Sequence, residues 1–365
     1  MDSSDSLITY DDNGICDHCR NYYNNIKPKW DSFNLGKLMS ISKQIKRSNK
    51  NSEFDCIIGI SGGLDSSYCV YIAKEVMKLN PLLVHVDAGW NTKQAVSNIQ
   101  NLVEGLGLEL FTEVINWEEM KELQLAFLKS GIPDQDLPQD YAFFSTLYRF
   151  AKKHRIKYIL TGSNFSTECV REPEEWGAHT GIDSILVKDI LKKFGSKKRM
   201  KFEVLDIFYY KIYYRYFYKI KVIHPCNYLE FNKEKVEKLL FEKFGWEKFK
   251  HKHHESRFTR FFEDYWLVNK FGFDKRKAHF SSLILTGQLT RDEAINRLKN
   301  SELGENFHQK EMKFIANKLN ITPEHLNELF NKPNKTVNDF NNNKNFIRLG
   351  KFFLKYFGKE KRNIR

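Results

Sequence analysis

The sequence predicts an α/β protein with a doubly wound parallel sheet, followed by a helical C-terminal region and preceded by a small segment. Apolar runs alternate with stretches of helical spacing between residues 54 and 164, which is typical of βαβ units. Polar clusters follow three of the apolar runs, and ligands of such sheets bind at the carboxyl ends of the strands. We therefore expect three parts: an N-terminal segment of residues 1–40, an α/β domain of residues 41–230 and a helical, basic region of residues 231–365.

The sheet is expected to contain four strands, because four apolar runs are each followed by polar or glycine-rich residues. The predicted strands are residues 54–60, 81–89, 108–115 and 157–164. The predicted helices between them are residues 65–79, 91–107 and 141–156. Each helix joins the end of one strand to the start of the next, as a parallel sheet requires.

The rest of the chain is less regular. Residues 201–223, and above all 207–219, interleave aromatic residues with Lys and Arg. Such a stretch could bind a membrane surface or stack on nucleic acid. A packed element whose basic side chains extend to solvent also explains it, and we favour that interpretation. Residues 232–250 and 280–330 are expected to be helical, and the basic, amphipathic tail forms a docking helix or a frayed end.

Composition restricts the class of protein. The 365 residues are 41% hydrophobic and 29% charged, which is typical of a soluble globular chain. No apolar run approaches the roughly 20 residues that span a bilayer. The acidic, polar N-terminus lacks a signal-peptide pattern, so we expect a cytoplasmic protein. The net charge of +13 fits nucleic acid, a membrane surface or an anionic substrate and does not choose among them.

The string "SGGLDSS" at residues 61–67 ends the first strand and begins a helix. Glycines allow close approach of the backbone to an anion, and the unpaired N–H groups of a helix start attract it. The turn has no Lys followed by Ser or Thr, which excludes a Walker A loop, and it lacks the G-x-G-x-x-G dinucleotide fingerprint. Asp65 would repel phosphates unless a cation lay between them, so it indicates Mg²⁺.

This string resembles the PP-loop of the ATP pyrophosphatase superfamily, whose members transfer AMP to a substrate oxygen and release pyrophosphate. Three further blocks extend the resemblance: "TGSNFSTECVREPEEWG" (161–177), "DSILVKDILKKFG" (183–195) and "HHESRFTRFFEDYWLVNKFGFDKRKAHFSSLILTGQLTRDEA" (253–294). With the turn, they resemble the N-acetyl sugar amidotransferase family. The resemblance implies an adenine nucleotide alpha hydrolase-like fold and the conversion of an acetamido group into an acetamidino group, in surface-polysaccharide, LPS O-antigen or flagellin-glycan pathways.

The resemblance also implies roles for individual residues. Those expected to bind ATP are Ser61, Gly62, Gly63, Leu64, Asp65, Ser66, Ser67, Asp87, Gly162 and Asn164. Those expected to be catalytic are Ser61, Asp65, Lys252 and Arg257. Those expected to bind the substrate are Thr167, Glu168, Trp176, His254, Arg260 and Arg276. The dense cations of residues 252–276 could neutralise phosphates, although a charge run is also the usual sign of a solvated helix face.

A C-x-x-C pair, Cys16 and Cys19, indicates half of a zinc-knuckle-like site. Family members carry an earlier pair, so this chain has lost half of a zinc ribbon or lacks its true start. A third option completes the site with His18 or Cys226, and a fourth is two plain thiols. We favour a degraded or truncated knuckle that binds Zn²⁺.

Partners follow from the same resemblance. The expected substrate is a nucleotide-linked N-acetylated sugar, with ATP and Mg²⁺, and a separate glutaminase would supply ammonia. No stable nucleic-acid partner and no transmembrane segment are expected. One alternative is a tRNA-thiolating PP-loop enzyme that uses the positive charge for RNA and a thiol such as Cys169 for sulfur transfer. Another is a nucleotide-binding module without catalysis. The sugar, its acetamido position and the oligomeric state are not specified by the sequence.

Overall fold

A computed structural model describes residues 1–30, 34–50, 52–177, 183–196, 203–250, 252–299 and 307–356. Within these residues the chain forms a five-stranded sheet in the order β3-β2-β1-β4-β5, and all pairs are parallel. The strands are β1 Cys56–Gly59, β2 Pro81–Asp87, β3 Leu110–Val114, β4 Tyr158–Leu160 and β5 Lys221–Ile223. The order runs outward in both directions from β1, which confirms the predicted doubly wound sheet.

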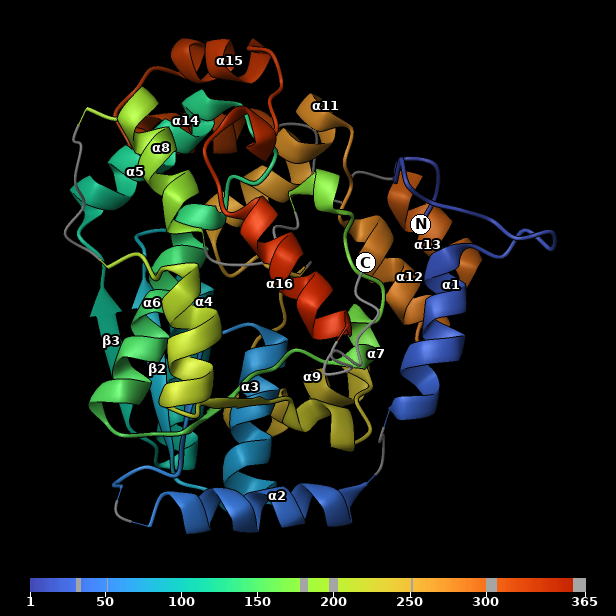
Figure 1. Cartoon of the computed structure of the whole chain (residues 1–365), viewed down its shortest axis with the longest axis vertical. Coiled ribbons are helices and arrows are strands. Elements are labelled where there is room, and N and C mark those ends of the chain that lie inside the picture. Colours follow the sequence, from blue (N-terminus) through green and yellow to red (C-terminus); the bar gives the residue numbers. More distant parts are fainter. Residues whose placement is uncertain are drawn as a thin grey trace.

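The sheet has helices on both faces (Figure 1). The side chains of its strands alternate between two cores, one on each face. Ile57, Val84 and Ile159 point to one face and join a core with helices α5, α6 and α8. Ile58 and Leu160 point to the other face and join a core with α2, α3, α4 and α9. Because both faces are covered, the central strands β1 and β4 are apolar throughout, as in other parallel sheets.

The helices that surround the sheet begin and end at recognisable signals. Asn34, Thr92 and Asn232 each accept a hydrogen bond from the backbone at the start of their helix, and Gly107 ends α4 with φ +57°. The α-helices up to the last strand are α1 Asp17–Asn21, α2 Leu35–Ser48, α3 Leu64–Tyr71, α4 Lys93–Leu106, α5 Trp117–Ser130, α6 Leu137–Lys153, α7 Phe165–Glu168 and α8 Ser184–Phe194.

The C-terminal region is helical, as predicted. Its α-helices are α9 Lys233–Phe244, α10 Arg257–Phe261, α11 Leu267–Phe271, α12 Arg276–Leu285, α13 Arg291–Lys299, α14 Phe307–Leu319, α15 Pro323–Asn331 and α16 Lys344–Tyr356. A separate core around Trp90, Phe258 and Trp266 joins several of these helices to the end of β2. The region therefore lies against the carboxyl edge of the sheet, where the functional site is expected.

Several short helical segments complete the fold. The π-helical segments are Tyr22–Ile26, Ile72–Val76, Tyr209–Phe217 and Phe262–Trp266, and the 3₁₀ segments are Lys27–Lys29, Glu174–Trp176, Pro225–Tyr228 and Val337–Asp339. The π-helix at 209–217 buries Tyr214 against α6 and leaves Phe217 exposed, so the aromatic stretch is partly a packed element. No helix among the described residues has the length and apolar character needed to cross a bilayer.

The structure differs from the sequence prediction at three places. The sheet has a further strand, β5, which the sequence analysis placed inside the aromatic stretch. Helix α5 was not predicted, although Asn116 caps its start by accepting from the Glu119 N–H group. Helix α2 crosses the expected boundary at residue 40. The division into three parts remains our proposal for the domain organisation.

Candidate active site

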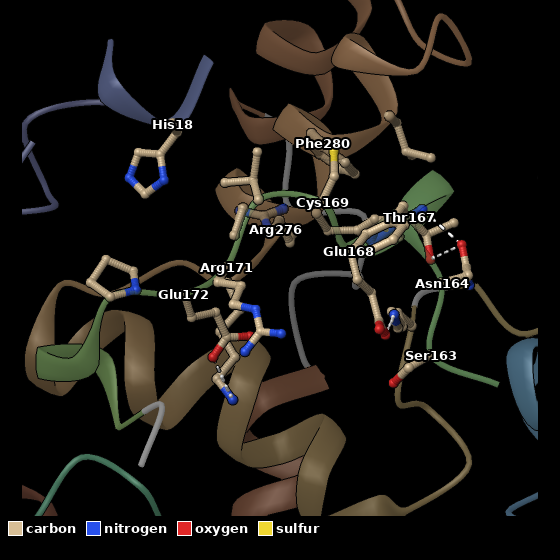
Figure 2. Close-up of a pocket in the computed structure, with 18 of the residues that line it drawn as sticks. His18, Ser163, Asn164, Thr167, Glu168, Cys169, Arg171, Glu172, Arg276 and Phe280 are labelled. Atoms are coloured by element: carbon tan, nitrogen blue, oxygen red, sulfur yellow. Dashed lines mark hydrogen bonds and ion pairs between the residues drawn. The ribbon is translucent and has the colours of Figure 1, made fainter. Parts of the chain in front are cut away.

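Two cavities meet at the carboxyl edge of the sheet. The smaller, of about 570 Å³, lies over the turn that follows β1, and the larger, of about 970 Å³, lies between α7, α12 and the N-terminal segment (Figure 2). Both are in the size range of small-molecule sites. They share eight lining residues, Ser163, Thr167, Glu168, His224, Lys233, Lys252, His253 and His279, which we call the shared wall.

The turn between β1 and α3 has the features of a phosphate site. Gly62 has φ +83°, and a Cβ there would lie 2.5 Å from the Ala95 carbonyl oxygen of α4, so only glycine fits. No side chain caps α3, which leaves the N–H groups of the helix start free of a side-chain acceptor. The Ser61 and Ser66 hydroxyl oxygens lie 3.2 Å apart beside this helix start. The turn thus presents the backbone N–H groups of the helix start to the smaller cavity.

The polar cluster after β4 reaches the same turn. The Asn164 side chain caps α7 by accepting from the Thr167 N–H group, and its amide nitrogen lies 3.3 Å from Asp65 Oδ1. Gly162 packs directly on the start of α3, because a Cβ there would lie 2.3 Å from the carbonyl carbon and oxygen of Asp65. The predicted meeting of two strand-end clusters is thereby found in the structure.

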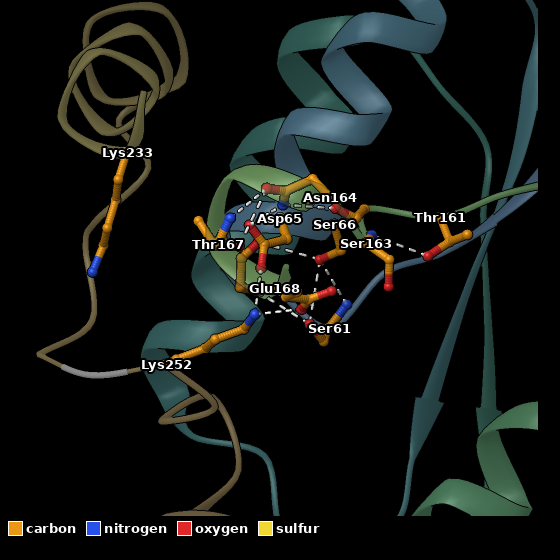
Figure 3. A network of polar contacts seen from close by, with 12 residues as sticks. Ser61, Asp65, Ser66, Thr161, Ser163, Asn164, Thr167, Glu168, Lys233 and Lys252 are labelled. Atoms are coloured by element: carbon orange, nitrogen blue, oxygen red, sulfur yellow. Dashed lines mark hydrogen bonds and ion pairs between the residues drawn. The ribbon is translucent and has the colours of Figure 1, made fainter. Parts of the chain in front are cut away.

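Lys252 connects the two cavities electrostatically. Its Nζ atom lies 3.2 Å from Asp65 Oδ2 and also donates to Glu168 Oε1 (Figure 3). Burial opposes the charge on Lys252, but the two carboxylates outweigh it and raise its pKa. Burial likewise works to raise the pKa of Glu168, but the charge and hydrogen bond of Lys252 lower it. Lys252 and Glu168 are therefore both charged at neutral pH.

Glu255 is a site residue that the sequence analysis missed. Its Oε1 atom accepts a hydrogen bond of 3.1 Å from Ser61 Oγ, and it lines the smaller cavity beside the turn. An antiparallel bridge between Asn91 and Ser256 fixes it there, with the Thr92 N–H group donating to the Glu255 carbonyl. The signal is weak in the sequence, because a single acid within a basic block has no distinctive spacing.

The structure brings most of the predicted site residues together. Ser61, Gly63, Leu64, Asp65, Ser66 and Gly162 line the smaller cavity, Asn164 and Arg276 line the larger one, and Thr167, Glu168 and Lys252 line both. Gly62 and Ser67 do not line either cavity but support the turn. The Gly62 carbonyl accepts a hydrogen bond from Trp246 Nε1, and Ser67 is fully buried.

Asp87 does not line either cavity. Its side chain accepts from the Gly89 N–H group and from the Asn91 amide, and so it fixes the loop that follows β2. His85 and Asn91 face the smaller cavity instead. His85 Nδ1 lies 2.9 Å from the Ile60 carbonyl oxygen. The strand end was located correctly, but its charged residue turns back onto its own loop.

Four other predicted residues also lie outside the lining of both cavities. Arg257 and Arg260 pair with the buried Glu311 of α14, at 2.7 and 3.0 Å. His254 Nε2 lies 2.7 Å from Asp264 Oδ2. Trp176 is buried against Phe273, and its Nε1 donates to the Ser4 carbonyl. These contacts hold the C-terminal helices and the N-terminal segment in place, because each side chain has its partner within the protein.

The cysteine pair has no further metal ligand in the described part of the chain. Cys16 Sγ and Cys19 Sγ lie 3.4 Å apart. His18 turns away to Asp5, with 2.7 Å between His18 Nε2 and Asp5 Oδ2, and Cys226 is buried in the core beside α3. No group of three or more His, Cys, Asp or Glu that could hold a metal occurs among the described residues. Among the described residues neither His18 nor Cys226 is gathered with the pair, and zinc binding by Cys16 and Cys19 stays a prediction.

Two family models match separate parts of the chain. The model for NAD synthase matches residues 37–170, which contain the turn and β1 to β4. The model described as LPS biosynthesis protein WbpG-like, C-terminal domain, matches residues 255–354, which begin at Glu255. The first match and the turn support a PP-loop fold for this part of the chain. With the second match, the findings support an amidotransferase-like PP-loop protein whose C-terminal part is similar to the WbpG-like C-terminal domain.

More distant likenesses accompany these matches. An uncharacterized protein of Methanocaldococcus jannaschii is 27% identical over 159 residues, which is 43% of this chain and 53% of that protein, so the chain spans about half the length of this relative. NMN synthetase from Francisella tularensis is similar over 83% of this chain and 100% of its own, with 16% identity and a TM-score of 0.35. NH3-dependent NAD synthetase from Campylobacter jejuni is similar over 82% and 98%, with 15% identity and a TM-score of 0.34. Neither structural likeness bears on the activity of this chain.

Proposed function

We propose that the protein is an ATP-dependent amidotransferase that converts the acetamido group of a nucleotide-linked sugar into an acetamidino group for a surface glycan. The observation that supports this most is the shared wall between the two cavities. ATP in the smaller cavity and an acceptor in the larger one would meet at Lys252, Glu168 and Asp65. Such an arrangement suits the transfer of AMP between two bound substrates.

The smaller cavity suits ATP at both ends. Donors of the turn at Ser61–Ser66 lie at one end, and aromatic side chains such as Phe143, Tyr148 and Tyr210 line the other, where an adenine could pack. Asp65 and Glu255 are carboxylates beside the turn, and Mg²⁺ is usually held by one or two carboxylates together with phosphates and water. These residues fit Mg²⁺, which when bound would neutralise the charge of the phosphates.

The reaction would proceed in two steps. The acetamido oxygen attacks the α-phosphorus of ATP, a P–O bond forms, and pyrophosphate leaves toward the turn. Ammonia then attacks the adenylated carbon and loses a proton, and AMP leaves with the former acetamido oxygen. The amide oxygen is a poor leaving group, and adenylation turns it into a good one. Lys252 is placed to stabilise negative charge on the transferring phosphoryl group.

Sulfur transfer is disfavoured by the cysteines. Cys169 lines the larger cavity, but burial raises the pKa of its thiol to about 11, so it is a protonated thiol at neutral pH. Cys56, Cys69 and Cys226 are buried in the core beneath the sheet, where burial raises their pKa values further. No observation therefore favours the tRNA-thiolating alternative, and we retain a separate glutaminase as the proposed ammonia source.

The test offers the protein ATP, Mg²⁺, ammonium and a panel of nucleotide-linked acetamido sugars. We expect release of pyrophosphate that depends on one sugar, and a product whose mass differs from the substrate by the exchange of O for NH. D65A should abolish this release, whereas D87A should retain most of it because Asp87 lies outside the cavities. Release without an acceptor, or an active D65A variant, would contradict the proposal.

A further inference from the structure

The shared wall carries more positive than negative charge. Its ionisable members are Glu168, Lys233, Lys252 and the histidines His224, His253 and His279. Lys252 is neutralised by Asp65 and Glu168, so the only carboxylate of the wall is already engaged. Lys233 is the other lysine of the wall. Among the described residues its one ion pair is a long contact of 3.8 Å between its Nζ atom and Glu237 Oε1. Figure 3 shows Lys233 apart from the network that joins Lys252 to Asp65 and Glu168.

The carboxylates of the larger cavity do not balance this charge, because several have cations of their own. Glu172 and Glu263 both pair with Lys275, at 3.2 and 3.1 Å. Asp274 pairs with Arg276 at 2.7 Å, and Asp5 with His18. Glu172, Glu263 and Asp274 are thus held in local ion pairs, whereas Lys233 has only its long contact to Glu237 among the described residues.

His279 lies within the same positive field. Its Nε2 atom is buried and has no hydrogen-bond partner among the described residues. The charged and titratable groups around it are Lys233 of α9, Lys252 and His253 of the following loop, and Arg297 of α13, with His224 and Glu168 on the same wall. Burial lowers the pKa of His279 well below its ordinary value, and Lys252, Lys233, His253 and Arg297 lower it further.

We propose that Lys233 and His279 form an anion subsite that holds a phosphate of the acceptor, the diphosphate that links the sugar to its nucleotide. This inference rests on the proposed function, because it assigns the larger cavity to the acceptor. An anion beside Lys233 and His279 would supply the missing negative charge.

The subsite has a consequence that binding alone reveals. His279 is neutral in the free protein at neutral pH, because its lowered pKa lies below that range. A bound phosphate offsets the cations around the ring and raises this pKa, so His279 takes up a proton as the anion binds. Proton uptake on binding is therefore a signature of this subsite and does not depend on turnover.

Calorimetric titration of the full chain with uridine diphosphate N-acetylglucosamine tests the proposal. We expect tighter binding of this probe than of free N-acetylglucosamine, and K233M should weaken it about tenfold. K235M is the matched control, because Lys235 lies in the same helix, is exposed and pairs with Glu230 at 2.9 Å. Titration in two buffers of different ionisation enthalpy should show proton uptake in the wild type and none in H279Q.

The outcomes separate the possible sources of the phosphate. If K233M weakens the binding of MgATP as much as that of the sugar nucleotide, the subsite belongs to ATP and the inference is overturned. It is also overturned if wild type does not bind the sugar nucleotide, if K233M and K235M behave alike, or if H279Q retains the proton uptake. Proton-linked binding without amidine formation would sustain the subsite and refute the proposed function. Amidine formation on a sugar nucleotide whose binding takes up no proton would sustain the proposed function and refute the subsite.

Discussion

Replacing Lys252 with methionine, K252M, removes the cation that joins the two cavities. The variant leaves Asp65 and Glu168 facing each other without a counter-charge. Losing one partner of a fully buried ion pair costs about 3–5 kcal/mol. Here the side chains of Lys252, Asp65 and Glu168 are 20%, 21% and 35% exposed, so water screens part of the loss. We expect a decrease of about 1–2 kcal/mol in the free energy of unfolding.

The same variant should change how stability depends on pH. In the wild type the pKa of Glu168 is lowered from 4.5, so its ionised form stabilises the fold above that value and the effect is lost as pH falls through the lowered pKa. Without Lys252, burial is left to raise the pKa of Glu168. The variant should therefore lose further stability as pH rises above 4.5, which denaturant unfolding between pH 5 and 8 measures.

Activity should fall much more than stability. Lys252 is the cation placed between the two substrates, and removing one such charge-stabilising group costs about 100-fold in rate. The assay is acceptor-dependent pyrophosphate release. K235M is the matched control, because Lys235 lines neither cavity and pairs with Glu230 at 2.9 Å, and it should stay within about threefold of the wild type by the same reasoning. A K252M variant as active as K235M would refute the role assigned to Lys252.

Three further variants test the surrounding structure. G162A should disable pyrophosphate release in a folded protein, because its Cβ would lie 2.3 Å from the Asp65 backbone, whereas G36A, with its nearest atom at 3.9 Å, should be silent. E311Q removes the carboxylate that pairs with Arg257 and Arg260, so it should lower the free energy of unfolding by about 2–4 kcal/mol without lowering turnover of the folded enzyme. Lost turnover at unchanged stability would contradict this. As pH rises from 5 to 8, D134N should gain about 2 kcal/mol in unfolding free energy relative to wild type. Burial raises the pKa of Asp134 from 3.8 to about 7, so only wild type has to ionise this buried group over that range. A difference between the two proteins that does not change with pH would contradict this.

The part of the site that the sequence predicted depends on local patterns. The turn at Ser61–Ser67 combines glycines, hydroxyls and an acid within a few residues, and its position after an apolar run is visible without a structure. The cluster at Thr161–Asn164 was found for the same reason. Both meet in the structure because β4 is the neighbour of β1, and the carboxyl ends of parallel strands share one edge.

The missed residues depend on contacts between distant segments. Glu255 reaches the turn through the bridge between Asn91 and Ser256. Lys233 and His279 are single residues on two helices, and only the fold places them on one wall. Conversely, Arg257 looked like a site residue because its counter-charge, Glu311, lies in another helix. A dense basic block therefore predicts charge but does not say which cations have partners.

Strand β5 escaped prediction for a different reason. It has three residues, Lys221–Ile223, of which Lys221 and Val222 are exposed, so it lacks the apolar run that marked the other strands. It pairs with β4 at the edge of the sheet, where burial is incomplete. The aromatic stretch before it concealed the boundary further, because Tyr210 and Tyr214 pack into the core whereas Phe208 and Phe217 face solvent.

The central claim is that the acetamido oxygen of the acceptor attacks ATP. Oxygen-18 placed in the acetamido carbonyl of the acceptor that the sugar panel identifies tests this most directly. After turnover with ATP, Mg²⁺ and ammonium, the account predicts one labelled oxygen in AMP, none in pyrophosphate, and an acetamidino sugar without label. Label that stays in the sugar, or that appears in pyrophosphate or inorganic phosphate, would contradict it.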